Sequence, residues 1–451
     1  MKRIVAFVVC ALAIVAMSAN IYAMDLMKSG NTGDDVRDVQ EMLIARGYLE
    51  ENDADGSFGP RTEQAVLAFQ QDNGLDATGM VGSATYEALK GDTDAAATDT
   101  ASAADLEQAK EPAKEIDFAK TFPSWDPDSA ALASLVDFAA ACTDEASPDY
   151  LEPADRIATF DMDGTILCEK APVYLDYCMT MYRVLDDQSY HATEEEREAM
   201  EEVRYHAYTF GEKYDPETIT KNDLVASAFA GMTPAEFRAY VLNFAGTVDA
   251  VGFEGMKYGE SFYKPMLEVI AFLKANDFDV CIVSASEREV TRALVEQFNI
   301  PLDHVIATDV PYLPSGIKDV PVDEYNMSQD ETIQLGAPLD PVECGLSNKP
   351  ASIMREIGKR PVLAFGNSSG DFSMLNFAQG NPDHPGMGFF VICDDTVREY
   401  GNEEKAAEYY TEVEKEGWTA ISMANDWKNI YGEGVQKTSL PGVEEEQADA
   451  A

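Results

Sequence analysis

The stretch Arg156-Ile-Ala-Thr-Phe-Asp-Met-Asp-Gly-Thr165 decides the fold that this sequence predicts. Its residues 157–160 form an apolar, partly β-branched run, which is typical of a short buried strand. The run ends at Asp161, and Asp163 and a glycine follow directly. Ligands of open α/β sheets bind beyond the carboxyl ends of the strands, where two carboxylates can provide a nucleophile or metal ligand and a proton donor. An acidic turn without chemistry is the alternative, which the tight Asp-x-Asp-Gly-Thr order disfavours.

The region from about 116 to 436 alternates between strand-like and helix-like patterns, which is typical of a parallel sheet with crossover helices. Apolar runs predict further strands at 278–283, 304–308, 361–365 and 389–393. Helical periodicity predicts helices at 128–142, 265–276 and 287–298. The sequence therefore predicts an α/β domain in which the carboxyl ends of several strands meet at one edge.

A long insertion separates the first predicted strand from the second. Residues 166–262 are mostly helical in pattern and rich in Glu, Tyr and Met. Because this segment exceeds what a simple crossover needs, we expect a mostly helical cap domain inserted over the site. Its tyrosines lie at near-helical spacing, which is typical of packing, and a pocket lining is the alternative. They are Tyr174, Tyr177, Tyr182, Tyr205 and Tyr208.

A serine follows the second predicted strand. Ser284-Ala-Ser286 lies at the end of 278–283, at the same relative place as Asp161 on its own strand. Ser284 can hydrogen-bond a phosphoryl oxygen there, together with backbone N–H groups of the following turn, which begins at Ala285. A helix N-cap is an equally good interpretation of this serine.

A lysine and an acidic loop complete the set. Lys349 precedes a proline at the start of a predicted helix, where its ammonium can neutralise a phosphoryl group and the aspartates. A solvent-exposed lysine is the alternative. The loop Gly366-Asn-Ser-Ser-Gly-Asp371 follows the strand 361–365. Hard oxygen ligands on a loop that faces two other carboxylates are what Mg²⁺ needs.

In order and type, these residues resemble the four motifs of the haloacid dehalogenase (HAD) superfamily of phosphatases. The resemblance implies that Asp161 is the nucleophile and forms an aspartyl-phosphate. It implies that Asp163 is the general acid and then the general base, which favours a phosphatase over a dehalogenase. Thr165, Ser284 and Ala285 are then substrate-binding residues that hold the phosphoryl group, and the catalytic Lys349 balances charge.

The resemblance also implies a bound Mg²⁺. Its ligands are Asp161, the backbone carbonyl of Asp163, and the loop residues Asn367 and Asp371. Asn367 stands where the family commonly has an acid. An amide oxygen can ligate Mg²⁺ but brings no charge, so which of the two loop residues is the direct ligand stays open.

Several longer strings are similar to one HAD branch, the phosphoserine phosphatase-like hydrolases. They are Asp155-Arg-Ile-Ala, Cys168-Glu-Lys-Ala-Pro172, Phe262-Tyr-Lys-Pro-Met266, the stretch 363–371 and Trp418-Thr-Ala-Ile-Ser-Met-Ala-Asn-Asp-Trp427. In such enzymes the cap selects the substrate, and Glu169 is a candidate contact from the cap side. A surface glutamate is the alternative for Glu169.

Residues 25–90 predict a separate small helical unit. A series of short motifs in this unit is similar to the three-helix peptidoglycan-binding domain of cell-wall hydrolases. The series begins with Gly30-x-x-Gly33, continues with Gly47-Tyr48 and Gly56-x-Phe58-Gly59, and ends with Gly82-x-x-Thr85. The resemblance implies that peptidoglycan is a partner and that the apolar residues of this unit form its core.

The remaining segments are predicted from composition. Residues 1–23 have a charged start, a short apolar run and a small final residue, which predicts a secretory signal peptide cleaved after Ala23 or, alternatively, Ala19. An uncleaved anchor is the alternative. Residues 91–115 and 437–451 hold few large apolar residues, which predicts a flexible linker and a disordered tail.

The formal net charge of −49 argues against nucleic-acid binding, which needs a cationic surface. With the predicted signal peptide removed, no stable membrane span is expected.

The motifs and segments described above lead to one hypothesis: an exported, cell-wall-associated, Mg²⁺-dependent phosphomonoester hydrolase. A wall-binding protein whose HAD domain has lost catalysis is the alternative. A peptidoglycan-cleaving enzyme is disfavoured, because no suitable His/Asp or Cys/His set is present outside the first unit.

Overall fold

The structure is a computed structural model whose chain divides into two compact units, residues 1–100 and 101–451. The predicted signal peptide (1–23) and linker (91–115) lie outside the described residues. Within the described part of the chain, no helix is both long enough and apolar enough to cross a membrane. The described residues are 33–49, 54–72, 79, 81, 85–86, 89, 116–214, 221–318, 321–337 and 343–442.

The first unit contains the helices α2 (Asp34–Ala45) and α3 (Pro60–Asp72). Pro60 begins α3, where its missing N–H costs no hydrogen bond. Gln40 is buried and fixes the turn before α3, because its side chain accepts from Gly56 N and donates to Thr62 Oγ1. Much of the predicted third helix lies outside the described residues. The unit's buried apolar core consists of Val36, Val39, Leu43, Phe58, Ala65, Val66, Phe69, Val81 and Leu89.

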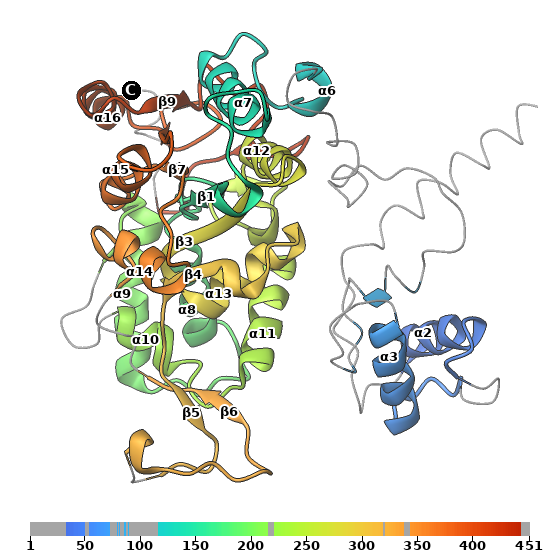
Figure 1. The fold of residues 1–451 in the computed structure, drawn as a ribbon. Coiled ribbons are helices and arrows are strands. Elements are labelled where there is room, and N and C mark those ends of the chain that lie inside the picture. Colours follow the sequence, from blue (N-terminus) through green and yellow to red (C-terminus); the bar gives the residue numbers. More distant parts are fainter. Residues whose placement is uncertain are drawn as a thin grey trace, which may run out of the picture. The chain divides into compact units, whose positions relative to one another are not determined.

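The second unit is built on a six-stranded parallel sheet in the order β4-β3-β1-β7-β8-β9 (Figure 1). The prediction of an α/β fold with a parallel sheet is confirmed. β1 lies between β3 and β7, which both come later in the chain, so the strand order changes direction there. The strands are β1 (Ile157–Phe160), β3 (Asp279–Glu287), β4 (Val305–Thr308), β7 (Leu363–Gly366), β8 (Met387–Ile392) and β9 (Thr419–Ser422).

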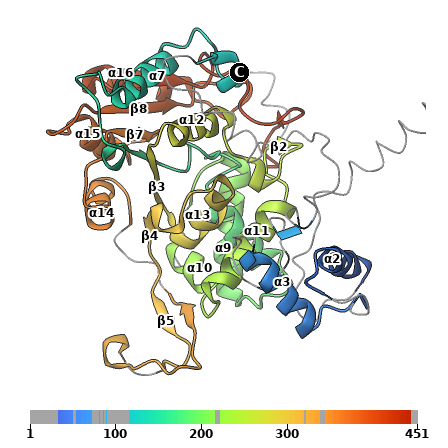
Figure 2. The ribbon, with the colours of Figure 1, turned by 45° about the vertical axis from the view of Figure 1, so that its right-hand side comes forward.

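Helices cover both faces of this sheet (Figure 2). Side chains alternate along the strands, so Phe389 and Val391 of β8 face one apolar cluster and Phe390 and Ile392 face the other. The first cluster includes α7 (Ala130–Thr143), α12 (Lys264–Ala275) and α13 (Arg288–Val295). The second includes α14 (Asn348–Glu356), α15 (Phe372–Gln379) and α16 (Glu403–Glu416). A short helix, α6 (Phe118–Thr121), precedes α7.

The insertion between β1 and β3 is mostly helical, and α9 and α11 each begin at a Thr/Glu capping box. Its helices are α8 (Leu175–Leu185), α9 (Glu194–Phe210), α10 (Lys221–Ser227) and α11 (Pro234–Thr247). A second insertion, which the sequence did not predict, follows β4 and forms an antiparallel hairpin of β5 (Tyr312–Pro314) and β6 (Ile333–Leu335). Leu335 exchanges backbone hydrogen bonds with the Gly231–Met232 turn, so the hairpin joins the first insertion.

The chain end differs from the prediction that order stops at residue 437. β10 (Gln436–Lys437) pairs with β2 (Phe253–Glu254), and Gly442 N donates to Tyr208 O. These bonds satisfy the backbone polar groups of the segment and hold it against the insertion. Residues 443–451 lie outside the described residues.

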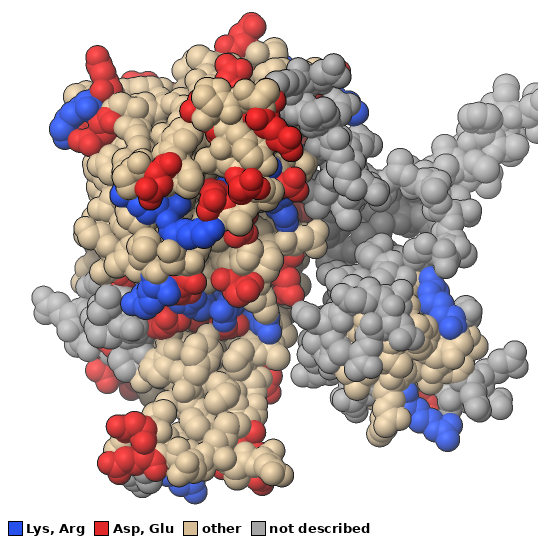
Figure 3. Space-filling model, in the orientation of Figure 1, with Lys and Arg blue, Asp and Glu red and all other residues tan. Residues whose placement is uncertain are grey.

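Acidic and basic side chains are mixed on one face of the second unit (Figure 3). On the face drawn in Figure 3, Lys and Arg lie among Asp and Glu rather than in a continuous basic surface.

Three phenylalanines of adjacent strands stack across the sheet. The rings of Phe160 and Phe365 are stacked at 4.2 Å between centroids, and those of Phe365 and Phe389 at 5.0 Å. We expect Phe365→Ala to lower the free energy of unfolding by about 3–5 kcal/mol, because it leaves a cavity in the middle of this stack. Urea unfolding followed by tryptophan fluorescence measures this, since Trp125, Trp418 and Trp427 all lie in the second unit.

Phe210→Ala is the matched control, because the side chain of Phe210 is 53% exposed. We expect it to change the free energy of unfolding by less than about 1 kcal/mol. Equal losses from the two substitutions would contradict the packing role of the stack.

Candidate active site

The predicted polar residues meet at the carboxyl ends of β1, β3 and β7. Asp161 follows β1, Ser284 lies on β3, and Asn367 follows β7. Lys349, in the first turn of α14, reaches the same place and donates to Val283 O at 2.6 Å. The side chains of Asp161, Ser284 and Lys349 are buried. The alternative of a solvent-exposed lysine is therefore wrong.

Lys349 lies between two carboxylates. Its Nζ is 2.5 Å from Asp161 Oδ1 and 2.7 Å from Asp371 Oδ1. Burial lowers the pKa of Lys349, but the two carboxylates outweigh burial and hold that pKa above its ordinary value. Burial and the nearby Asp371 carboxylate raise the pKa of Asp161 to about 8, against the ion pair with Lys349. Lys349 therefore forms ion pairs with two carboxylates. With both acids ionised, the three side chains carry a net negative charge.

Asp163 lies on the side of the site formed by β3. Its Oδ2 accepts a hydrogen bond of 2.7 Å from Ser286 Oγ, and both side chains are buried. Ser284 Oγ accepts from Ser286 N at 3.1 Å, so both serines shape the turn after β3. The sequence pattern alone assigned no role to Ser286. The sequence could have indicated Ser286 as a site residue, because it follows Ser284 by two positions and such residues lie on the same face of an extended strand.

The loop after β7 folds around Asp371. Asp371 Oδ2 accepts hydrogen bonds from the backbone N–H groups of Asn367 and Ser368 at 3.0 and 3.1 Å. A Cβ at position 366 would lie 2.4 Å from Asp371 Cβ, so Gly366 permits this close approach. Since Lys349 occupies its other oxygen, Asp371 holds the loop and the lysine in place.

Asn367 extends from this loop toward the turn after β1. Thr165 Oγ1 donates to both Asp161 Oδ2 and Asn367 Oδ1 at 3.3 Å, so the two acceptor oxygens converge on one point. A Cβ at position 164 would lie 1.9 Å from Asn367 Nδ2, and the φ of Gly164 is +85°. Only glycine suits that conformation and that space.

The two remaining predicted residues lie at the rim. Glu169 is half-buried, and its Oε2 accepts from Asn367 Nδ2 at 3.3 Å. Ala285 is exposed, and its carbonyl accepts from Thr308 Oγ1 at 2.7 Å. Burial and the charges of Glu169, Asp163 and Asp161 raise the pKa of Tyr174, a residue of the insertion, well above its ordinary value. The insertion and the sheet therefore meet at this rim.

Two segments of the chain match known family models. Residues 158–376 match the model of haloacid dehalogenase-like hydrolases. The matched region contains β3, β7, most of β1 and every site residue described above, so this part of the sheet is similar to that of HAD-like hydrolases. Residues 32–89 match the model of a peptidoglycan binding domain.

Individual relatives cover parts of the chain. The N-acetylmuramoyl-L-alanine amidase CwlL of Bacillus licheniformis is 42% identical over 65 residues, which are 14% of this chain and 18% of that amidase. A protein of unknown function from Bordetella pertussis Tohama I is 15% identical with a TM-score of 0.38, covering 59% of this chain and 97% of that one. A HAD family hydrolase from Salmonella enterica serovar Typhi is 15% identical with a TM-score of 0.33, covering 61% and 69%. The fold assignment rests on the strand order and the matched family model.

The shared lysine makes the stability of the metal-free protein depend on pH. The folded-state pKa of Asp161, about 8, lies above its ordinary value of 3.8, so the folded protein binds the extra proton between these values. The contribution of Asp161 to the free energy of unfolding is therefore complete below about pH 4. As the pH rises to about 8, this contribution decreases by at most about 1.4 kcal/mol per pH unit. Asn cannot titrate, so we expect the free energy of unfolding of Asp161→Asn, relative to wild type, to rise between about pH 5 and about pH 8.

Urea unfolding in EDTA at both pH values measures this difference. Subtracting the wild-type curve removes the general effect of net charge, because both proteins share every other acid. A difference that stays constant with pH would show that Asp161 is ionised throughout this range. It would contradict the raised pKa of Asp161 in the folded protein.

Proposed function

We propose that this protein is an exported, cell-wall-associated, Mg²⁺-dependent phosphomonoester hydrolase that acts through an aspartyl-phosphate on Asp161. The observation that carries the proposal is the buried pairing of Asp161 with Lys349 beside the hydrogen-bonded pair Asp163 and Ser286. The proposed nucleophile Asp161, the proposed proton donor Asp163 and the counter-charge of Lys349 thus lie together at the carboxyl ends of the strands.

In the proposed reaction, the Asp161 carboxylate attacks the phosphorus atom and the bond to the alcohol oxygen breaks. Asp163 donates its proton to that oxygen, and the alcohol leaves. Asp163 then takes a proton from a water molecule, whose oxygen attacks the phosphorus of the aspartyl-phosphate. Inorganic phosphate is released, and the carboxylate of Asp161 and the acid form of Asp163 are restored. Positioning and charge neutralisation account for most of the rate in such transfers.

The donor set of the site fits Mg²⁺. Asp161 Oδ2 and Asn367 Oδ1 are hard oxygen donors that converge within 3.3 Å of the same hydroxyl, Thr165 Oγ1. These two side chains, with the backbone carbonyl of Asp163, would hold the ion. Asp371 would act through the loop that it organises, since both its oxygens have partners. Bound Mg²⁺ supplies positive charge that stabilises the transferring phosphoryl group.

The phosphoryl group itself would be held by Thr165, Ser284 and the backbone N–H of Ala285. Lys349 would neutralise charge as it builds up on the transferred oxygens. We propose that the helical insertion over this edge acts as the cap, with Glu169 and Tyr174 facing the alcohol part of a small substrate. The sequence strings noted above resemble phosphoserine phosphatase-like hydrolases of broad or unassigned substrate, so phosphoserine, phosphocholine, a sugar phosphate and a nucleotide are all candidate substrates.

Wall association rests on the first unit. The match of residues 32–89 to a peptidoglycan binding domain favours placement of the hydrolase at the cell envelope. The rival function, a non-catalytic wall-binding protein, is favoured by Asn367, which brings no charge to the metal. It is disfavoured because Asp161, Asp163 and Lys349 are all buried and Lys349 forms an ion pair with Asp161.

Hydrolysis of para-nitrophenyl phosphate tests the proposal. We expect turnover with Mg²⁺, loss of turnover in EDTA, and a decrease of at least about a thousandfold in Asp161→Asn, because no aspartyl-phosphate can form. The variant serves as its own folding control through the unfolding measurement described above. No turnover by a folded wild-type protein would favour the scaffold, and equal turnover by the variant would exclude Asp161 as nucleophile.

Ser286 is expected to position the proton donor. Its hydroxyl donates to one oxygen of Asp163, so Ser286→Ala removes a hydrogen bond that orients the acid. We expect kcat to fall about tenfold to a hundredfold for an alkyl phosphate, whose leaving group needs a proton, and less than about threefold for para-nitrophenyl phosphate. Ser368→Ala is the matched control, since Ser368 contacts Asp371 and not Asp163. Equal losses on both substrates would indicate a purely structural effect.

A further inference from the structure

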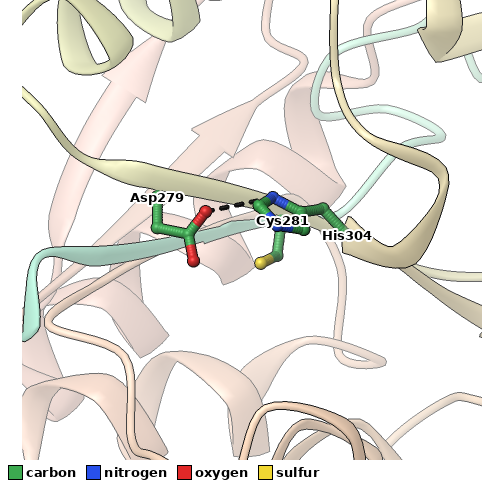
Figure 4. Close-up of side chains that lie close together, drawn as sticks. All are labelled: Asp279, Cys281 and His304. Carbon is green, nitrogen blue, oxygen red and sulfur yellow. Dashed lines mark ion pairs between the residues drawn. The ribbon is translucent and has the colours of Figure 1, made fainter. Parts of the chain in front are cut away.

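Three residues with different metal-binding atoms lie together at the opposite end of the sheet from the active site. They are Asp279 and Cys281 of β3 and His304, which directly precedes β4 (Figure 4). Their ligand atoms all lie within 4.8 Å of one another. Asp279 begins β3 and pairs with Ile157, the first residue of β1, so the cluster lies at the amino ends of the parallel strands.

The sheet register explains why these side chains meet. Asp279 and Cys281 are two positions apart on an extended strand and therefore point to the same face. β3 and β4 are parallel neighbours with Ile282 opposite Val305, so His304 comes beside Cys281. His304 Nδ1 is 3.0 Å from Asp279 Oδ1, which Figure 4 shows as a direct contact. The amino ends of two neighbouring strands are thus joined through one cluster.

Burial in the cluster increases from the carboxylate to the thiol. The side chain of Asp279 is 43% exposed and that of His304 is 28% exposed, whereas Cys281 is buried. An ion from solvent can therefore reach the two exposed groups first, and the sulfur lies behind them. All three groups belong to strand ends held by the sheet, so their positions are fixed before an ion binds.

We propose that Asp279, Cys281 and His304 form a second metal site, which takes a divalent transition-metal ion such as Zn²⁺ and is distinct from the hard-oxygen active site. Thiolate, imidazole and carboxylate are the ligands that Zn²⁺ uses, with water in the fourth position. Two ligand atoms of a tetrahedral zinc site lie roughly 3.3–3.6 Å apart, so small side-chain rotations complete the geometry. The proton leaves the Cys281 thiol to solvent when the sulfur binds.

A bound ion would tie β4 to β3. β4 is an edge strand of the sheet, and the hairpin of β5 and β6 follows it. The site would therefore stabilise the edge from which this second insertion extends. The chain's formal net charge of −49 further raises the local concentration of cations.

Titration of the EDTA-treated full-length protein with Co²⁺ tests the site, because a cobalt–thiolate bond gives a charge-transfer band in the near ultraviolet. The oxygen ligands of the active site give no such band. We expect a band that saturates at one ion per chain and disappears on addition of Zn²⁺. Cys281→Ser should abolish it, and His304→Gln should weaken Co²⁺ affinity by more than about tenfold.

Cys393→Ser is the matched control, because Cys393 is a free and more exposed thiol outside the cluster. It should keep the band, as should Asp161→Asn, which alters only the active site. Absence of the band in wild type, or its persistence in Cys281→Ser, would overturn the proposal. Unchanged affinity in His304→Gln, a conservative change at a partly exposed position, would overturn it as well.

Discussion

The ammonium of Lys349, buried between the carboxylates of Asp161 and Asp371, is the interaction on which the rest of the site depends. Removing ions from water costs several kcal/mol each unless opposite charges and hydrogen bonds compensate. Here one cation faces two nearby acids, with Asp163 close by, so compensation is incomplete. The site favours an additional positive charge, which a proton or a metal ion can supply.

That arrangement requires rigid support, because its members come from distant parts of the chain. Asp161 and Lys349 are separated by 188 residues in sequence. The sheet provides the support, since apolar clusters on both faces fix β1, β3 and β7 against their helices. β1 lies between β3 and β7, so the carboxyl ends of all three strands come together at one end of the sheet.

The strongly acidic composition and the proposed site for anionic substrates are compatible because electrostatic interactions are strongest at short range. At moderate ionic strength, exposed charges are screened beyond roughly 10 Å, whereas the buried Lys349 is screened much less. The two ends of the sheet also differ in chemistry. Carboxylate and amide oxygens gather at the carboxyl ends, and a thiol, an imidazole and a carboxylate gather at the amino ends of β3 and β4.

The sequence by itself determined the central strands and the acids that follow them. Buried parallel strands are continuous apolar runs, and β1, β3, β4, β7 and β8 all coincide with such runs to within a few residues. The half-exposed edge strand β9 and the short hairpin strands β5 and β6 carry no such run, so they were not predicted.

Only the tertiary structure decided which side chains touch. The contact of Ser286 with Asp163 spans 123 residues and depends on the register of β3 against β1, as does the approach of His304 to Cys281 across β3 and β4. The order of residues 437–442 likewise depends on backbone partners in the insertion. Local sequence fixes the strands, but pairing between strands fixes the chemistry, because hydrogen bonds and ion pairs act only at contact distance.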